Sequence, residues 1–229
     1  MLTYILTQIS TTADAGLGVA VPETTADSIT LIDLVLKGGV IMIPIFLLSI
    51  VAIYVIVERA LSIRKATENT DSLLTKLKSL ISSGDIKGAK LAAEQYHNPV
   101  AKMLAKGVSK IGQPIKNIEN AMEGVGKVEL MKLEKNMALL GIVAAIAPML
   151  GFVGTISGVI TIFYNISLAD NISIGLIAGG LYQKMVTSAA GLIVGMIAHT
   201  GYHYLQMMIE NVVLKMETAA LEFVELVSE

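Results

Sequence analysis

The stretch NMALLGIVAAIAPMLGFVGTISGVITIFYNISLA, residues 136–169, contains no charged side chain. About 20 apolar residues are enough to cross the ~30 Å hydrocarbon core of a bilayer. As one straight helix at ~1.5 Å per residue, this stretch would reach about 50 Å, which exceeds the thickness of that core. It therefore predicts a membrane-spanning helix with a helical extension into water.

Two further stretches have the same character. Residues 38–57 carry no charge, and from residue 171 to residue 209 only Lys184 is charged. Of the 229 residues, 54% are hydrophobic and 16% are charged, and the mean hydropathy is +0.69, which is typical of integral membrane proteins. We place the membrane spans near residues 38–58, 139–164 and 174–200.

The charge and the residue types exclude several functions. The net charge is -2 and the sequence pI is about 6.0, which argues against nucleic-acid binding as the main task. Because the chain has no cysteine, disulfides, thiolate metal sites and cysteine nucleophiles are excluded. We expect no cofactor, no metal and no enzyme activity.

The positive charges predict the orientation. Of the 17 Lys and Arg residues, 14 lie between Arg59 and Lys135. Cytoplasmic segments carry the excess of Lys and Arg, so residues 59–138 are predicted to be a cytoplasmic helical domain. The loop 165–173 then lies outside, and residues 201–229 form a cytoplasmic C-terminal helix. The predicted fold class is all-α, with three transmembrane helices and long cytoplasmic helical extensions.

The N-terminal segment, residues 1–37, lies outside in this topology. It lacks a basic n-region and so does not look like a signal peptide. Apolar residues within 29–36 suggest a short amphipathic helix at the outer interface. A plain tether explains them equally well.

Local signals divide the cytoplasmic domain into helices. The segment 58–82 reads as one helix, which ends at Ser83-Gly84-Asp85, and Asp85 is a candidate cap for a helix over 86–96. Asn98-Pro99 begins another, with proline in a favoured first position. Gly112-Gln113-Pro114 ends that helix, and from Pro114 the helical pattern runs without a break into the second span.

Carboxylates are absent from the second and third spans. No Asp or Glu lies between Lys135 and Asp170, or between Asp170 and Glu210. A proton-carrying transporter normally keeps an ionisable acid or histidine inside the membrane. If this protein conducts protons, the titrating acid must come from a partner, or water must carry them.

Small and polar residues recur at helical spacing in these two spans. They are Gly154, Gly158, Thr161 and Asn165, then Ala144, Pro148, Gly151 and Thr155, and in the third span Lys184, Ser188, Gly191, Gly195 and Tyr202 with Gln183 and Thr187 alongside. Such residues either form packing seams, with the hydroxyls bonded back to their own helix, or line a pore between several copies. Pro148 predicts a kink that Gly151 would ease.

Two sets of residues leave alternatives open. Lys184 lies about ten residues into the third span, where it either extends to the outer surface or faces a protein-lined cavity and meets a carboxylate from elsewhere. His199 and His203 have a spacing that suits a metal. With no acid within reach on that turn, packing at the membrane interface is the simpler interpretation of the pair.

Three motifs give the chain a family resemblance. The run APMLGFVGTISG at 147–158 resembles the second-span motif of the MotA/TolQ/ExbB proton-channel family, and QKMVTSAAGL at 183–192 is similar to its third-span motif. The stretch from Gly84 to Ala101 also looks like the family's cytoplasmic region. The likeness covers about residues 30–210 and is closest to the ExbB branch, with TolQ next.

The resemblance implies a proton channel or stator subunit of an inner-membrane motor. It implies a homopentamer in a bacterial inner membrane, with a periplasmic N-terminus and a cytoplasmic C-terminus. An ExbD-like single-span dimer inside the pore would carry the protonatable Asp, and a TonB-like protein would pass the energy to outer-membrane transport.

The resemblance also assigns residues to the pathway. Thr155 matches the family's second-span pore threonine, and Ser188 stands where a third-span threonine is usual, with Thr187 beside it. Gln183 stands where many ExbB proteins have a Glu, which puts acid-based gating there in doubt. Lys184 is unusual in the motif and is a candidate partner for the Asp. A TolQ-like envelope role, a solute transporter and a membrane scaffold remain alternatives.

Overall fold

The structure, a computed structural model, describes residues 39–67, 70–168 and 174–228. They belong to one of the two units into which the chain divides, Val35–Glu229. The other unit, Met1–Leu34, lies outside the described residues, and so does the whole of the suggested outer amphipathic helix within 29–36. The same is true of residues 169–173 of the predicted outer loop.

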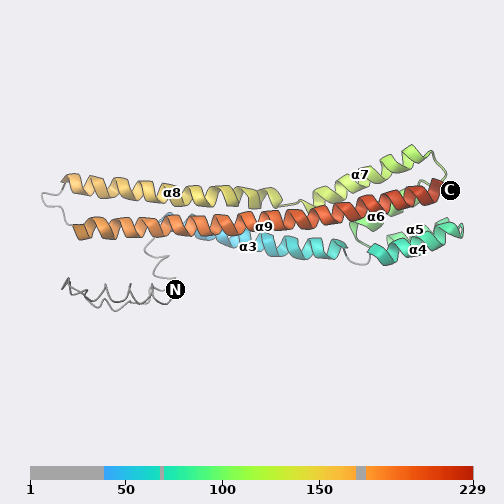
Figure 1. Cartoon of the computed structure of the whole chain (residues 1–229), viewed down its shortest axis with the longest axis horizontal. Coiled ribbons are helices and arrows are strands. Elements are labelled where there is room, and N and C mark those ends of the chain that lie inside the picture. The colour runs from blue at the N-terminus through green and yellow to red at the C-terminus, as the bar shows by residue number, and fades with distance from the viewer. Residues whose placement is uncertain (1–38, 68–69, 169–173, 229) are drawn as a thin grey trace, which may run out of the picture. The chain divides into compact units, whose positions relative to one another are not determined.

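The described residues form helices and no strands, as the sequence predicts. In chain order the helices are α3 (Met42–Thr67), α4 (Thr70–Ser82), α5 (Ile86–Glu94), α6 (Pro99–Val108), α7 (Ile115–Leu133), α8 (Met137–Leu168) and α9 (Ile174–Ser228) (Figure 1).

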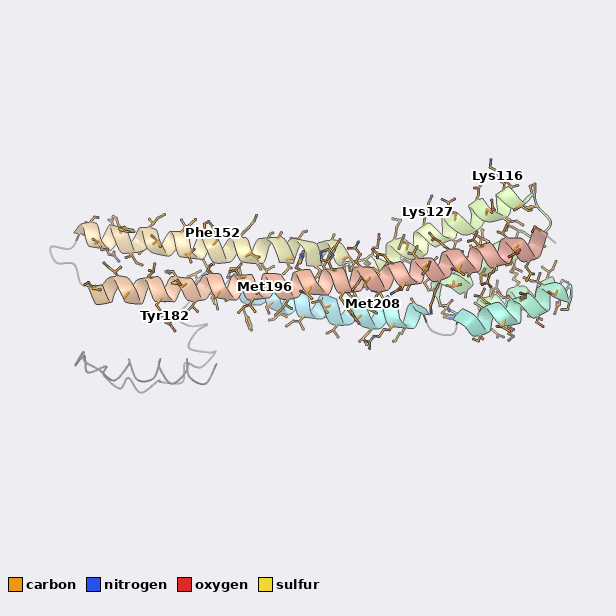
Figure 2. The ribbon with its side chains drawn as sticks, in the orientation of Figure 1. Lys116, Lys127, Phe152, Tyr182, Met196 and Met208 are labelled. Carbon is orange, nitrogen blue, oxygen red and sulfur yellow. The ribbon has the colours of Figure 1, made fainter. Side chains whose placement is uncertain are left out.

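Within the part of the chain that the structure describes, three helical stretches are long and apolar enough to cross a membrane, as many as the sequence predicts. They are Met42–Ala66 in α3, Ile115–Leu168, which includes α8, and Ile177–Ser228 in α9. Helix α8 packs along α9, and α3 contacts both (Figure 1). Their outer surfaces are apolar: Phe152 projects from α8 and Tyr182 from α9, away from each other (Figure 2). Lipid chains are the solvent that suits such a surface.

The second half of α9 organises the helices outside the predicted spans. Helices α4, α6 and α7 pack against it (Figure 1). Its buried residues recur every three or four positions, which gives one apolar stripe along the helix. They are Leu205, Ile209, Val212, Met216, Ala219 and Phe223.

The predicted cap at Asp85 and the predicted helix start at Asn98-Pro99 are both present. Asp85 accepts a hydrogen bond from the Gly88 amide at 2.9 Å, and Asn98 accepts one from the Ala101 amide at 2.7 Å. Gly112 adopts a φ of 92°, which a residue without a β-carbon tolerates, and α7 begins just after it. The helix predicted over 86–96 ends slightly earlier, at Glu94.

Two predicted helices are interrupted. The segment 58–82 is divided between α3, which ends at Thr67, and α4, which begins at Thr70. The pattern predicted to run unbroken from Pro114 stops at Glu134–Asn136, between α7 and α8. Asn136 has a φ of 65°, a left-handed conformation that asparagine accepts and that ends helices. Leu133 and Met137 are buried on either side, so the apolar pattern continues across the break and hides it.

Candidate functional site

Glycines bring α8 and α9 into backbone contact. A β-carbon on Gly191 would lie 2.6 Å from the Ala147 carbonyl oxygen, and one on Gly151 would lie 3.1 Å from the Ser188 carbonyl oxygen. Gly195 faces the ring of Pro148, through which α8 continues. Only hydrogen fits at these points, so the two helices meet more closely than larger residues would allow.

The hydroxyl residues of this contact lie at neighbouring levels. Thr155 is one turn beyond Gly151 on α8, and Ser188 lies against Gly151 from α9. Both residues are half-buried within the subunit, and the Thr155 hydroxyl donates to the Phe152 carbonyl at 2.6 Å. Their partial exposure leaves both residues accessible at one edge of the helix pair.

Thr187 is placed differently. It is only 1% exposed and packs against Gly154, whose β-carbon would lie 2.9 Å from the Thr187 methyl group. Its hydroxyl donates to the carbonyl of Gln183, a half-buried residue, at 3.4 Å. Thr187 therefore lies inside the subunit, while Ser188 beside it lies nearer the surface.

Lys184 crosses α8 through a gap that a glycine provides. A β-carbon on Gly158 would overlap the Lys184 side chain from Cγ to Cε. The Nζ atom lies 4.0 Å from where a β-carbon of Gly39 would be, just before α3 begins. The lysine is half-buried. Its ammonium group thus lies where α3, α8 and α9 meet.

A network of ions joins three helices near the predicted inner ends of the spans. Glu129, on α7, is 6% exposed and accepts hydrogen bonds from Lys102 on α6 at 2.9 Å and Lys132 at 2.6 Å. Arg59, on α3, pairs with Glu58 and donates to the Lys132 carbonyl at 3.2 Å. Sequence reasoning missed Glu129.

A signal for Glu129 is present in the sequence. It follows Ile118 and Met122 at helical spacing and precedes Leu133, so it occupies a core position of an apolar stripe. A carboxylate at such a position requires a positively charged partner. Glu129 has two such partners, and one of them, Lys132, lies one turn away on the same helix.

Histidines cluster at the inner end of the third predicted span. The rings of His199 and His203 lie edge to face with their centroids 4.5 Å apart, and the Tyr202 ring lies 5.3 Å from that of His203. Among the residues that the structure describes, no three His, Cys, Asp or Glu side chains are grouped so as to hold a metal ion.

The sequences of known proteins match this part of the chain. Residues 95–218 match the sequence profile of the MotA/TolQ/ExbB proton channel family. Over 190 residues the chain is 28% identical to a biopolymer transport ExbB homologue of Methanothermobacter thermautotrophicus, covering 82% of this chain and 67% of that one. It is 28% identical over 171 residues to a biopolymer transport protein, ExbB-like 1, of Synechocystis, covering 73% and 67%.

A third relative is the biopolymer transport protein ExbB of Neisseria meningitidis, which is 26% identical over 188 residues, or 74% of this chain and 84% of that protein. The matching profile spans more than half of the chain, and it includes α8, its contact with α9 and both half-buried hydroxyl residues. This chain therefore belongs to the MotA/TolQ/ExbB proton channel family and is similar to its ExbB members.

Proposed function

We propose that this membrane subunit is an ExbB-like part of an inner-membrane motor driven by the proton motive force. Five copies enclose the single spans of an ExbD-like dimer, and a TonB-like protein passes the energy to transport across the outer membrane. The N-terminus is periplasmic and the C-terminus is cytoplasmic. The family match and the ExbB relatives support this proposal.

One observation carries the proposal: a pair of accessible hydroxyl residues lies on two predicted membrane-spanning stretches that have no carboxylate. Thr155 and Ser188 lie at neighbouring levels of α8 and α9, while residues 136–169 and 171–209 contain no Asp or Glu. Hydroxyls can orient water and accept hydrogen bonds, but they do not hold a proton near neutral pH. The group that takes up the proton therefore comes from another chain, which is the role of the partner's Asp.

The other residues have supporting roles in this proposal. Gly151, Gly154, Gly158, Gly191 and Gly195 allow α8 and α9 to pack closely, and Pro148 fits against the last of them. Thr187 fills the space beside Gly154. Gln183 takes the place of the family's usual Glu, so it orients water without titrating. Lys184 sets a positive charge near the start of α3, where it is a candidate counter-ion for the partner's Asp.

Proton flux tests the role of the hydroxyls. The full chain is co-purified with its single-span partner and reconstituted in vesicles that contain a pH-sensitive dye. We expect Thr155→Val with Ser188→Ala to lower the flux by at least about tenfold, because the pathway loses two groups that orient its water. Thr161→Val is the matched control, since the Thr161 hydroxyl also bonds back to its own helix but lies about two turns further out.

The outcomes separate the proposal from its alternatives. Full flux in the double variant would contradict the role of the two hydroxyls. A wild-type complex that carries no protons would favour a scaffold. Proton flux coupled to uptake of a solute would favour a transporter. A normal motor that supports envelope integrity rather than uptake would point to a TolQ-like role.

A further inference from the structure

Titratable side chains continue the line of Ser188 along α9. Ser188, His199 and Glu210 follow each other at intervals of 11 residues. Because 11 residues make just over three turns of an α-helix, these residues lie on one side of α9, about 16 Å apart along its axis. Whatever side Ser188 faces, His199 and Glu210 face it too, further inward.

The histidine pair is open on this side. His199 and His203 are exposed, with their rings 4.5 Å apart. Helix α3 packs against Gly201 through Ile56, and Gly201 lies on the opposite side of α9 from His199. Helix α8 contacts α9 through Gly191 and Gly195 and contains no charged residue. Neither helix covers the pair.

An acidic groove of about 550 Å³ follows inward from the histidines. Its walls come from the α7–α8 junction and from α9, and its ionisable residues are Tyr202, Glu134, Glu210 and Glu217. Among the described residues, no lysine or arginine lines it. Gln206 lies between the histidines and the carboxylates, and its amide donates to Glu210 at 3.4 Å. The polar groups that line the groove are thus a phenol, an amide and three carboxylates.

The stretch between Ser188 and His199 has no titratable group. Leu192 and Met196 are the exposed side chains on this side of α9 between the two, and both are apolar. A proton that moves inward past Ser188 on water therefore meets its first side-chain acceptor at His199. A neutral imidazole has a nitrogen that accepts a proton, and the imidazolium has an N–H that can give one up, so this side chain can relay a proton.

We propose that His199 and His203 take up protons as they leave the membrane and pass them to the acidic groove. This inference rests on the proposed proton pathway. A neutral imidazole nitrogen takes a proton from hydronium and leaves water. The imidazolium then gives its proton to water, which releases it to the cytoplasm or carries it on to the Glu210 carboxylate. Each histidine returns to its neutral form, so the cycle needs no other reactant.

The test uses the full chain with its single-span partner in vesicles, with flux read by a trapped pH dye. We expect His199→Gln with His203→Gln to lower the flux by about tenfold, within the usual range for losing a proton-transfer group. Free imidazole in the buffer should restore most of that flux, because a diffusible base can replace a missing acceptor.

The control is His97→Gln, which removes the chain's remaining histidine, an exposed residue in the turn before α6. We expect it to conduct like the wild type. Flux in the double variant equal to wild type would overturn the inference and leave the proposed pathway standing. Reduced flux without imidazole rescue would also overturn it, because the pair would then only pack at the interface. A wild-type complex without flux would defeat both proposals.

Discussion

At the scale of single residues, Glu129 holds together parts of the chain that are far apart in sequence. Its carboxylate binds Lys102 on α6 and Lys132 on its own helix. Burial raises the pKa of Glu129, but the hydrogen bonds from Lys132 and Lys102 outweigh burial and hold the pKa below its ordinary value. The folded state therefore favours the charged form.

This charge makes the stability of the fold sensitive to acid. We expect Glu129→Gln to destabilise the protein by about 1–3 kcal/mol near neutral pH, because two charge-assisted hydrogen bonds are lost. A carboxylate whose pKa is lowered on folding contributes stability above its ordinary pKa of about 4.3 and loses it as pH falls through the lowered value. Thermal midpoints at pH 7.5, 5.5 and 3 in detergent would measure the change.

The wild type and the variant should differ at the two higher pH values and converge at the lowest. Glu123→Gln is the matched control, since Glu123 pairs with Lys127 at 2.6 Å on the same helix but at an exposed position. We expect no measurable effect from it. Equal midpoints for wild type and Glu129→Gln at pH 7.5 would show that the buried ion network contributes nothing.

Sequence reasoning succeeds at this scale where the partner of a residue is local. The caps at Asp85 and Asn98 were predictable because each binds an amide only three residues away. Glu129 was not predicted because Lys102 lies 27 residues away on another helix. The same distinction separates Thr187 from Ser188, since spacing alone does not tell which of two neighbouring hydroxyls the fold buries.

At the scale of elements, the contact between α8 and α9 depends on the absence of side chains. Gly191 makes the closest approach to backbone atoms, because its Cα faces the Ala147 carbonyl oxygen and the Gly151 backbone. Neither of these can move without bending α8. By contrast, a β-carbon on Gly179, near the outer end of α9, would have nothing within 4 Å.

Replacing each glycine by alanine should therefore have opposite effects. We expect Gly191→Ala to destabilise the protein by about 1–3 kcal/mol through overpacking. Gly179→Ala should be neutral or stabilising by up to about 1 kcal/mol, since alanine favours the helix. The thermal midpoint of the monodisperse protein in detergent measures both. An unchanged midpoint for Gly191→Ala would mean that the two helices separate easily at this level.

Helix boundaries were predictable where turn residues mark them and not where the apolar pattern continues. Glycine and proline mark the start of α7, and hydropathy marks α8 and α9. The α7–α8 junction has a single asparagine between two buried residues, Leu133 and Met137. A periodic pattern therefore crosses it, although the backbone does not continue as one helix.

At the scale of the whole molecule, the three spans were predictable from long apolar stretches, and the family was predictable from motifs that follow each other in order. The packing contacts that each span makes with other helices were not predictable. Hydropathy shows that α3 enters the membrane, but not that Ile41, just before it, lies against Gly154 of α8. That contact depends on side-chain shape in three helices at once.

Native mass spectrometry tests the assembly. We expect the detergent-purified chain to form a pentamer, and to add two copies of a single-span neighbour when the two are co-expressed. The reason is that the half-buried edge with Thr155 and Ser188 becomes a pore only when several copies enclose it. A monomer or dimer that ignores its neighbour would contradict the motor and leave this edge as a packing surface.

Helix α9 is one continuous helix of 55 residues. At 1.5 Å per residue it is about 80 Å long, so a tilt of 5° about one end carries the other end sideways by about 7 Å. If α9 instead rotates about its own axis, a different row of its side chains comes to face a given direction. That change occurs at both ends of the helix at the same time. Small angular changes near Ser188 are thus converted by a single rigid rod into large displacements at Phe223.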